Sequence, residues 1–329
     1  MDPRTVKFIC FAAFGGAALW AGYAARKRQW VREEVSRHVH LHTVVWVWSS
    51  VSLLSLWVQP LRWRDAPLAM VQVILVGASA LAAVGVCRAL RLARPQIAAV
   101  SISSGLGNLG FTLGGYVCYV LLTPHATALG IAIAYVTVMQ VAGVVLLYPL
   151  ARHYSQHAPG DVGLGRLILS GLWDVRAAPL YGALLGEVLG TMKLPVPGAV
   201  GQWHLIDILF YLGSFGGYFG IGLRLRLGDS LKLLKGHAVA AGVKFVFIPL
   251  LTVAMLMLLA QLHWPLSPTA RQVALVEAAM PTAIQSVMIA NLFHLDSRQA
   301  SSLWLWNTVL FFILGFPLVL LVVAGRPGV

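Results

Sequence analysis

The sequence predicts an all-α integral membrane protein, because its composition is apolar, its apolar runs are long, and its basic residues gather in the loops between those runs. Hydrophobic residues make up 59% of the 329 positions and charged residues only 11%, against about 25% charged residues in an ordinary soluble domain. Lipid is therefore expected to solvate most of the surface. The net charge of +13 belongs mainly to loops, where it orients helices and meets anionic headgroups, so no nucleic-acid partner is expected.

Ten apolar runs have the length of a membrane-spanning helix, which needs about 20 residues. Basic residues follow the first run, with no clear small-residue cleavage site, so we expect a helix there and not a signal peptide. The sixth run contains Asp174 and Arg176, for which a salt bridge at the membrane interface is expected. The runs span residues 5–24, 43–60, 66–90, 97–122, 126–151, 166–190, 203–223, 237–262, 272–293 and 300–324.

The loop charges predict the orientation of these helices. When the loops are assigned alternately to the two sides, most lysines and arginines fall on one side, which should be the cytoplasmic one. Both termini are then outside, and the chain divides into two five-helix units, residues 1–155 and 156–329. After an odd number of crossings the second unit enters the membrane upside down, which is the inverted-repeat plan of many secondary transporters. No organelle address is visible, so a plasma membrane or bacterial inner membrane is expected.

The fourth run of each unit contains a helix-breaking segment near its middle, Gly105–Gly110 in the first and Met280–Ala283 in the second. Within a helix, glycine is less favourable than alanine by about 1 kcal/mol and proline by about 3 kcal/mol. Backbone groups freed by a break are tolerated in a membrane only inside protein or beside a watery cavity. Close helix packing and a simple kink are the alternatives for either break alone. The matched positions favour a shared site, where half-helix N-termini would attract an anion.

Several segments around these breaks resemble the auxin efflux carrier family. Residues 277–284 look like part of the family's C-terminal region, and residues 108–111 resemble its first crossover pattern, Asn-x-Gly-Phe. The resemblance extends over most of residues 100–324 and rests on the order and spacing of the motifs. Its other parts are residues 178–186, 219–223, 289–291 and 301–320.

The resemblance implies ten helices in two inverted five-helix repeats, with helices four and nine broken and crossed, as in the NhaA-like fold and the bile-acid, arsenite and riboflavin carriers. It also implies transport of a small organic anion such as a carboxylate. Asn108 would be the polar group of the first crossover and Pro281 the breaker of the second. One position departs from the pattern, because Gly115 stands where the family usually has proline. The backbone geometry that proline would fix is lost there, and a flexible glycine is expected to loosen the helix instead.

We expect the substrate to bind at the crossover, through half-helix dipoles and amide groups. Uncharged polar side chains within the later apolar runs supply further hydrogen-bonding groups that could line the cavity. The expected substrate-binding residues are Asn108, Gly110, Pro281, Gln285 and Asn307.

Glu277 and Asp207 lie inside apolar runs and are candidates for proton coupling. A charge at the bilayer centre costs at least about 2.5–3.5 kcal/mol, so each acid needs a partner or a task. Glu277 stands one helical turn before the proline of the second break, and its alternative role is an ordinary carboxylate paired with Arg271. The alternative for Asp207 is a structural ion pair with Lys244. Sodium stays open as the coupling ion, with the hydroxyl groups near the first break as ligands.

The sequence favours a secondary carrier of a small organic anion that works by alternating access. A sodium-coupled symporter of the bile-acid type with the same fold is one alternative, and a membrane receptor that does not transport is another. No catalytic motif is visible, so no enzyme is expected. No metal or other cofactor is expected either, because only His38, His40 and His42 cluster and no cysteine accompanies them. The expected partners are the organic anion and the lipid bilayer, and a homodimer is left open.

Overall fold

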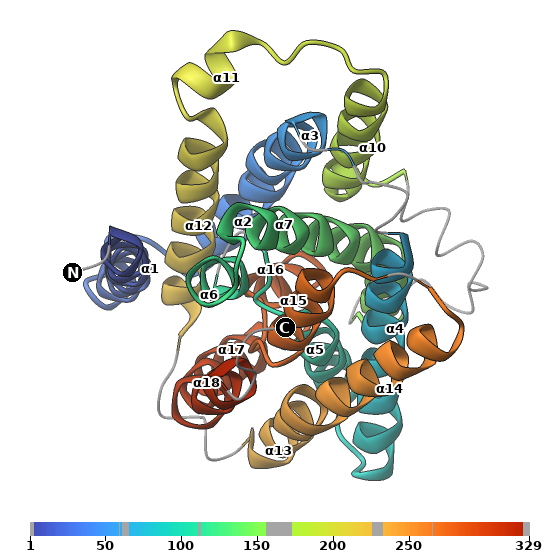
Figure 1. Ribbon diagram of the computed structural model, residues 1–329. Helices are drawn as coiled ribbons and strands as arrows, with labels where there is room; N and C mark the ends of the chain where they lie inside the picture. The colour runs from blue at the N-terminus through green and yellow to red at the C-terminus, as the bar shows by residue number, and fades with distance from the viewer. Residues whose placement is uncertain are drawn as a thin grey trace.

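In the computed structural model of the chain, every regular element of the described residues is helical (Figure 1). The described residues are 3–58, 60, 66–110, 113–155, 173–225, 233–264 and 266–324. The all-helical prediction is therefore confirmed for this part of the chain. Six helices are long and apolar enough to cross a membrane, namely Val35–Val58, Ala66–Ala89, Thr127–Tyr154, Leu205–Arg224, Leu234–Gln261 and Ser297–Leu320.

The helices of the first half include one interrupted pair, α5 and α6, at the place where the sequence predicts a break. The elements are α1 (Pro3–Lys27), α2 (Val35–His42), η1 (Thr43–Trp48), α3 (Ser49–Val58), α4 (Ala66–Ala89), α5 (Arg94–Gly105), α6 (Leu113–Leu121), α7 (His125–Ala142), η3 (Gly143–Leu147) and α8 (Tyr148–Tyr154).

The second half contains the other interrupted pair, α15 and α16. Its elements are η4 (Val175–Ala177), α10 (Ala178–Thr191), α11 (Gly198–Gln202), α12 (Leu205–Arg224), α13 (Leu234–Gly242), η6 (Val243–Phe247), α14 (Ile248–Gln261), α15 (Pro268–Ala278), α16 (Ile284–Leu292), α17 (Ser297–Leu310), η7 (Phe311–Gly315) and α18 (Phe316–Ala324).

Three long helices contain a π-helical turn that ends two residues before a proline. The turns η3, η6 and η7 precede Pro149, Pro249 and Pro317. Proline has no N–H to donate, and its ring clashes with the carbonyl four residues earlier. A locally widened turn accommodates that clash without ending the helix, so each of these helices continues beyond its proline.

The helices form two groups that meet near the middle of the molecule. In one group α1 packs along α12, and α10 packs along α3 (Figure 1). Glycines allow the second of these contacts, because Gly182, Gly186 and Gly190 recur every fourth residue on α10 and lie against backbone carbonyls of α3. Small residues at this spacing let two membrane helices approach closely.

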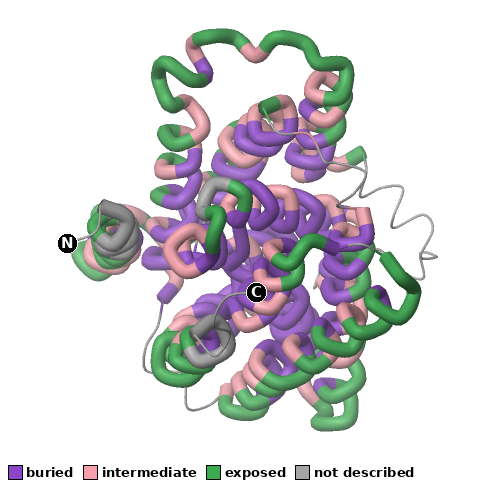
Figure 2. The backbone as a smooth tube through the Cα atoms, in the orientation of Figure 1, coloured by how far each residue is buried: buried purple, intermediate pink, exposed green. Residues whose placement is uncertain are grey.

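The other group contains α4 to α8 and α13 to α18, with the half-helices α5, α15 and α16 near its centre (Figure 1). Buried residues concentrate in this central region, and exposed residues lie at the ends and around the outside (Figure 2). α5 illustrates the burial of the central region most clearly, because the last nine of its residues, from Ile97 to Gly105, are all buried. The two interrupted helices are therefore enclosed by protein, as unpaired backbone groups in a membrane require.

Candidate functional site at the paired helix breaks

The first break begins where α5 ends at Gly105. Leu106 is extended, with φ −104° and ψ 123°, and Gly110 has a φ of +52° that favours glycine. The Gly114 N–H, in the first turn of α6, donates to the carbonyl of Asn108 at 2.9 Å. Among the described residues of this break, the chain thus leaves α5 through the extended Leu106 and contains one left-handed residue, Gly110.

The second break lies between Ala278 and Ile284, and it pairs with the first. The N–H of Asn108 donates to the carbonyl of Pro281 at 2.7 Å, and the N–H of Ala283 donates to the carbonyl of Leu106 at 3.0 Å. Gly107 and Thr282 form the antiparallel bridge between these two bonds. Each break thus satisfies backbone groups that the other leaves free, so neither is stable in the membrane without its partner.

Side chains from neighbouring segments hold the second break in place. The Thr282 hydroxyl donates to the carbonyl of Ser103 at 3.1 Å and accepts from the Asn307 side-chain amide at 2.7 Å. The three residues are at most 1% exposed. Asn307 therefore acts on the backbone of the second break through Thr282.

Replacing Thr282 by valine should destabilise the protein by about 1–3 kcal/mol, because a buried amide and a buried carbonyl each lose a partner while the side-chain shape is kept. The thermal unfolding midpoint of the purified protein in detergent should fall accordingly. Thr191→Val at the exposed end of α10 is the matched control and should leave the midpoint almost unchanged. Equal midpoints for the two variants would show that this hydrogen-bond chain does not hold the break.

A small cavity lies beside the paired breaks, at the start of α16. Asn108, Gln140 and Gln285 line it together with apolar residues that include Trp48 and Ile284. The carbonyl oxygen of Gln140 accepts from Ser52 at 2.7 Å, which leaves the amide group of that side chain as the donor. The first-turn N–H groups of a helix have no acceptor within the helix and carry partial positive charge. The cavity thus combines amide donors with a half-helix N-terminus.

Glu277 lies near the start of the other half-helix, α6. Its side chain is buried, and one carboxylate oxygen accepts from the N–H of Gly110 at 3.0 Å. The second oxygen is buried without a hydrogen-bond partner in the described residues, and it lies where a Cβ on Gly114 would be. The alternative pairing of Glu277 with Arg271 is absent from the ion pairs of the described residues.

Residues 167–319 match the sequence model of a family described as membrane transport protein, which is the family of the auxin efflux carriers. The match supports the assignment of the chain to this family over 153 of its 329 residues. The resemblance inferred from the motifs is therefore confirmed, and the matched segment contains the second break with α15 and α16. The family is one of transporters and not of enzymes. No curated protein matches the chain.

The structure brings most of the expected substrate residues to the crossover, some by their side chains and others by their backbone groups. Asn108 and Gln285 line the small cavity. Gly110 and Pro281 contribute backbone groups, a donor to Glu277 and an acceptor for the N–H of Asn108. Asn307 is buried behind the second break and does not line the cavity.

Asp207 is not brought to the crossover. It lies in the first turn of α12 with a side chain that is 72% exposed, and its carboxylate is 3.6 Å from the ring of His204. The expected ion pair of Asp207 with Lys244 is wrong, because Lys244 is buried on η6 and lines a cavity beside Glu277. The apolar run around Asp207 concealed that this residue stands at the end of its helix.

Sequence reasoning did not single out two further features of the described residues. Lys244 is buried next to the first break, and the hydrophobic run around it gave no sign of a cavity. His40 is buried and lies 3.2 Å from the side-chain amide of Asn291, whereas His38 and His42 do not share that environment. The expected salt bridge of Asp174 is confirmed with Arg176 at 3.6 Å, and Arg152 also pairs with this carboxylate.

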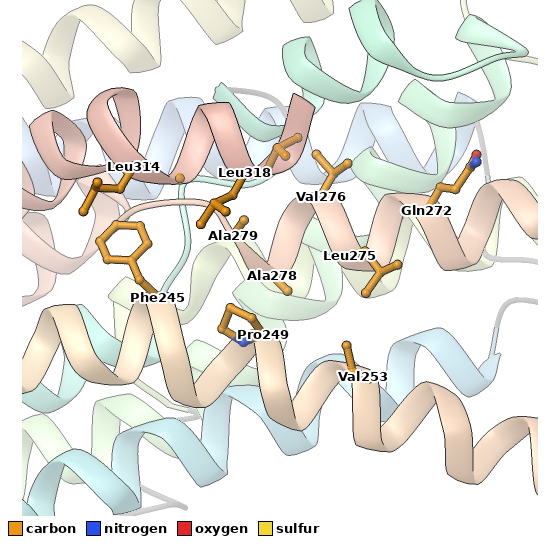
Figure 3. Close-up of a pocket in the computed structure, with 12 residues that line it drawn as sticks. Phe245, Pro249, Val253, Gln272, Leu275, Val276, Ala278, Ala279, Leu314 and Leu318 are labelled. Atoms are coloured by element: carbon orange, nitrogen blue, oxygen red, sulfur yellow. The ribbon is translucent and has the colours of Figure 1, made fainter. Parts of the chain in front are cut away.

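A separate apolar cavity of about 280 Å³ lies among α14, α15 and α18 (Figure 3). Phe245, Pro249, Val276 and Leu318 are among its lining residues, and Gln272 supplies a polar side chain near one edge. No converging donors are present among these residues to hold an organic anion. The small cavity at the paired breaks, which has three amide side chains in its wall, is therefore the better candidate site for such a substrate.

Proposed function

We propose that the chain is a secondary carrier of a small organic anion, such as a carboxylate, and that the anion binds in the small cavity at the start of α16. The observation that carries this proposal is the pairing of the two breaks, which leaves the α16 N-terminus beside Asn108, Gln140 and Gln285. Partial positive charge and amide donors suit a carboxylate.

The two breaks differ in a way that favours an external anion at only one of them. Gly107 and Thr282 face each other in the bridge, so we treat them as equivalent positions of two repeats. Five residues earlier, the second half has Glu277 and the first half has Ile102. Glu277 supplies a carboxylate to the start of α6, and Ile102 supplies none to the start of α16. A carboxylate from solution would bind at the start of α16, in the place equivalent to that of the Glu277 carboxylate at the start of α6.

We also propose that the chain consists of two inverted five-helix repeats, residues 1–155 and 156–329. The paired breaks support this plan, because each belongs to the same position in its half. A second feature supports it as well. The turns η3 and η7, in the helix that ends each half, are followed by similar segments, Tyr148-Pro149-Leu150 and Phe316-Pro317-Leu318.

Alternating access would move the group that contains the breaks against the group of α1, α2, α3, α10 and α12, with the segment that leads into α2. The polar contacts between these groups support a state closed on one side. The Asn291 amide donates to Ser36 at 2.9 Å, Arg224 donates to Ser297 at 2.9 Å, and Arg298 lies 3.7 Å from Glu33. We assign this side to the cytoplasm from the loop charges, with both termini outside, in a plasma membrane or bacterial inner membrane.

Glu277 is the proposed proton-coupling residue. In Glu277→Gln the side-chain carbonyl can still accept from Gly110, so the protein should fold, but its charge no longer changes. Flux driven by a proton gradient should fall about tenfold or more, which corresponds to about 1.4 kcal/mol. Glu277→Leu is the contrasting variant and should unfold at lower temperature, because it leaves the Gly110 N–H without an acceptor. Unchanged proton-driven flux in the folded glutamine variant would exclude this role.

The function is tested by uptake and efflux in proteoliposomes across a panel of mono- and dicarboxylates, with and without pH and sodium gradients. The proposal expects saturable flux of at least one carboxylate. Flux that requires sodium would favour a symporter of the bile-acid type, and a folded protein that moves no anion would favour a receptor.

A further inference from the structure

A second cavity borders the paired breaks, and it contains two buried ionisable side chains of opposite charge. Lys244 and Glu277 both line it, and each is 2% exposed. Gln72 and Tyr135 add polar groups to its wall. The proposed substrate cavity contains neither charged side chain. The proposed function uses Glu277, but it gives no task to Lys244.

This cavity lies at the C-terminal ends of two half-helices, whereas the substrate cavity lies at the N-terminal end of one. The partial charges that the helix ends present to the two cavities are therefore opposite. Its wall includes Gly105 and Ala278, the last residues of α5 and α15. The last carbonyls of a helix lack intrahelical partners and carry partial negative charge. Two such ends meet here, so the cavity favours a cation, whereas the start of α16 favours an anion.

The ammonium group of Lys244 already supplies a cation to this cavity. Its ammonium nitrogen is 3.6 Å from the point that a Cβ on Gly107 would occupy, so it reaches the backbone of the first break. Glu277 contacts the same break from its other end, through the N–H of Gly110. One oxygen of Glu277 is buried and has no hydrogen-bond partner among the described residues. The described ion pairs do not join Lys244 to Glu277, so the two groups share the cavity without a closed salt bridge.

We propose that the Lys244 ammonium is the resident cation of the crossover and occupies the place that a coupling sodium ion would take. Sodium is a monovalent cation that prefers oxygen ligands, and Glu277, Gln72 and Tyr135 bring side-chain oxygens to the cavity at the C-terminal ends of α5 and α15. With an ammonium already present, the site does not admit sodium. This inference rests on the proposed carrier function and selects between its two candidate coupling ions, excluding sodium at this site.

The test compares thermal unfolding of the purified full-length chain in sodium chloride and in choline chloride at equal ionic strength. Wild type should unfold at the same temperature in both salts. Lys244→Ala opens room beside Glu277, and sodium should raise its midpoint by about 3 °C or more. Lys244→Met fills the space without charge and should show no response to sodium. The double variant Lys244→Ala/Glu277→Gln should also lose the response, because it lacks the carboxylate.

A sodium-specific shift in wild type would overturn the proposal, and so would a folded Lys244→Ala protein without such a shift. If Lys244→Ala folds poorly, the fraction of monodisperse protein after extraction in each salt replaces the midpoint. That fraction should recover in sodium and not in choline, and equal fractions would contradict the proposal. No substrate is present in these measurements. A failure of anion flux would therefore overturn the carrier function separately, without changing the result for Lys244.

Discussion

Replacing Gly115 by proline, the residue that the auxin efflux carriers usually have at this position, should prevent stable folding of this chain. A Cβ at position 115 would overlap the carbonyl oxygen of Gly110. Gly110 cannot move away freely, because its N–H is bonded to Glu277 and its φ of +52° is part of the first break. We expect a loss of about 3 kcal/mol or more, since overpacking against fixed backbone is among the most destabilising single changes.

The thermal unfolding midpoint and the monodisperse fraction in detergent measure this effect. Gly115→Ala should also be strongly destabilised, because the overlap arises at the Cβ and not in the proline ring. Gly85→Ala is the matched control within a long helix, where nothing lies within 4 Å of the added carbon. That control should be neutral or more stable by about 0.5–1 kcal/mol. A Gly115→Pro protein as stable as wild type would contradict the described geometry of the first break.

The same position shows what a family pattern leaves out. The sequence suggested that glycine at position 115 loosens the helix after the first break. In the structure, Gly115 is instead the residue whose missing side chain makes room for the Gly110 carbonyl. That conclusion depends on the path of the chain through the break, and no local propensity of the sequence contains it.

The positions of the breaks were predictable because glycine and proline act on the backbone of their own segment. Gly105–Gly110 and Met280–Ala283 interrupt runs that are otherwise apolar enough for one continuous helix. The hydrogen bonds between them, from Asn108 to Pro281 and from Ala283 to Leu106, join residues about 175 positions apart. The sequence could suggest that the breaks meet, but not which carbonyl each N–H would find.

The charged residues were harder to predict, for the same reason. The burial of Glu277 could be inferred from the sequence because it stands in an apolar run, one helical turn before the proline of the second break. Asp207 and Lys244 looked like a pair because they lie in neighbouring apolar runs of the sequence. Whether two such side chains face each other depends on how the helices pack, and here one is exposed and the other is at the crossover. It is thus easier to infer from the sequence that a charged side chain is buried than to infer which residue it pairs with.

A fixed negative charge at the start of α16, beside Asn108 and Gln285, is the most direct test of whether an organic anion binds there. Gln285→Glu and Asn108→Asp keep the size of each side chain and place a carboxylate in the cavity. Like charges in a poorly solvated site repel by several kcal/mol. Gln202→Glu on the exposed surface of α11 is the control for added charge.

The measurement is the initial rate of uptake, in proteoliposomes, of the carboxylate that wild type transports best. We expect Gln285→Glu and Asn108→Asp to reduce the rate by about a hundredfold or more, which corresponds to about 2.8 kcal/mol, and Gln202→Glu to leave it unchanged. Each variant should remain monodisperse, so that lost uptake reports on the site and not on folding. Uptake by both folded site variants at the rate of wild type would contradict the placement of the substrate at the paired breaks.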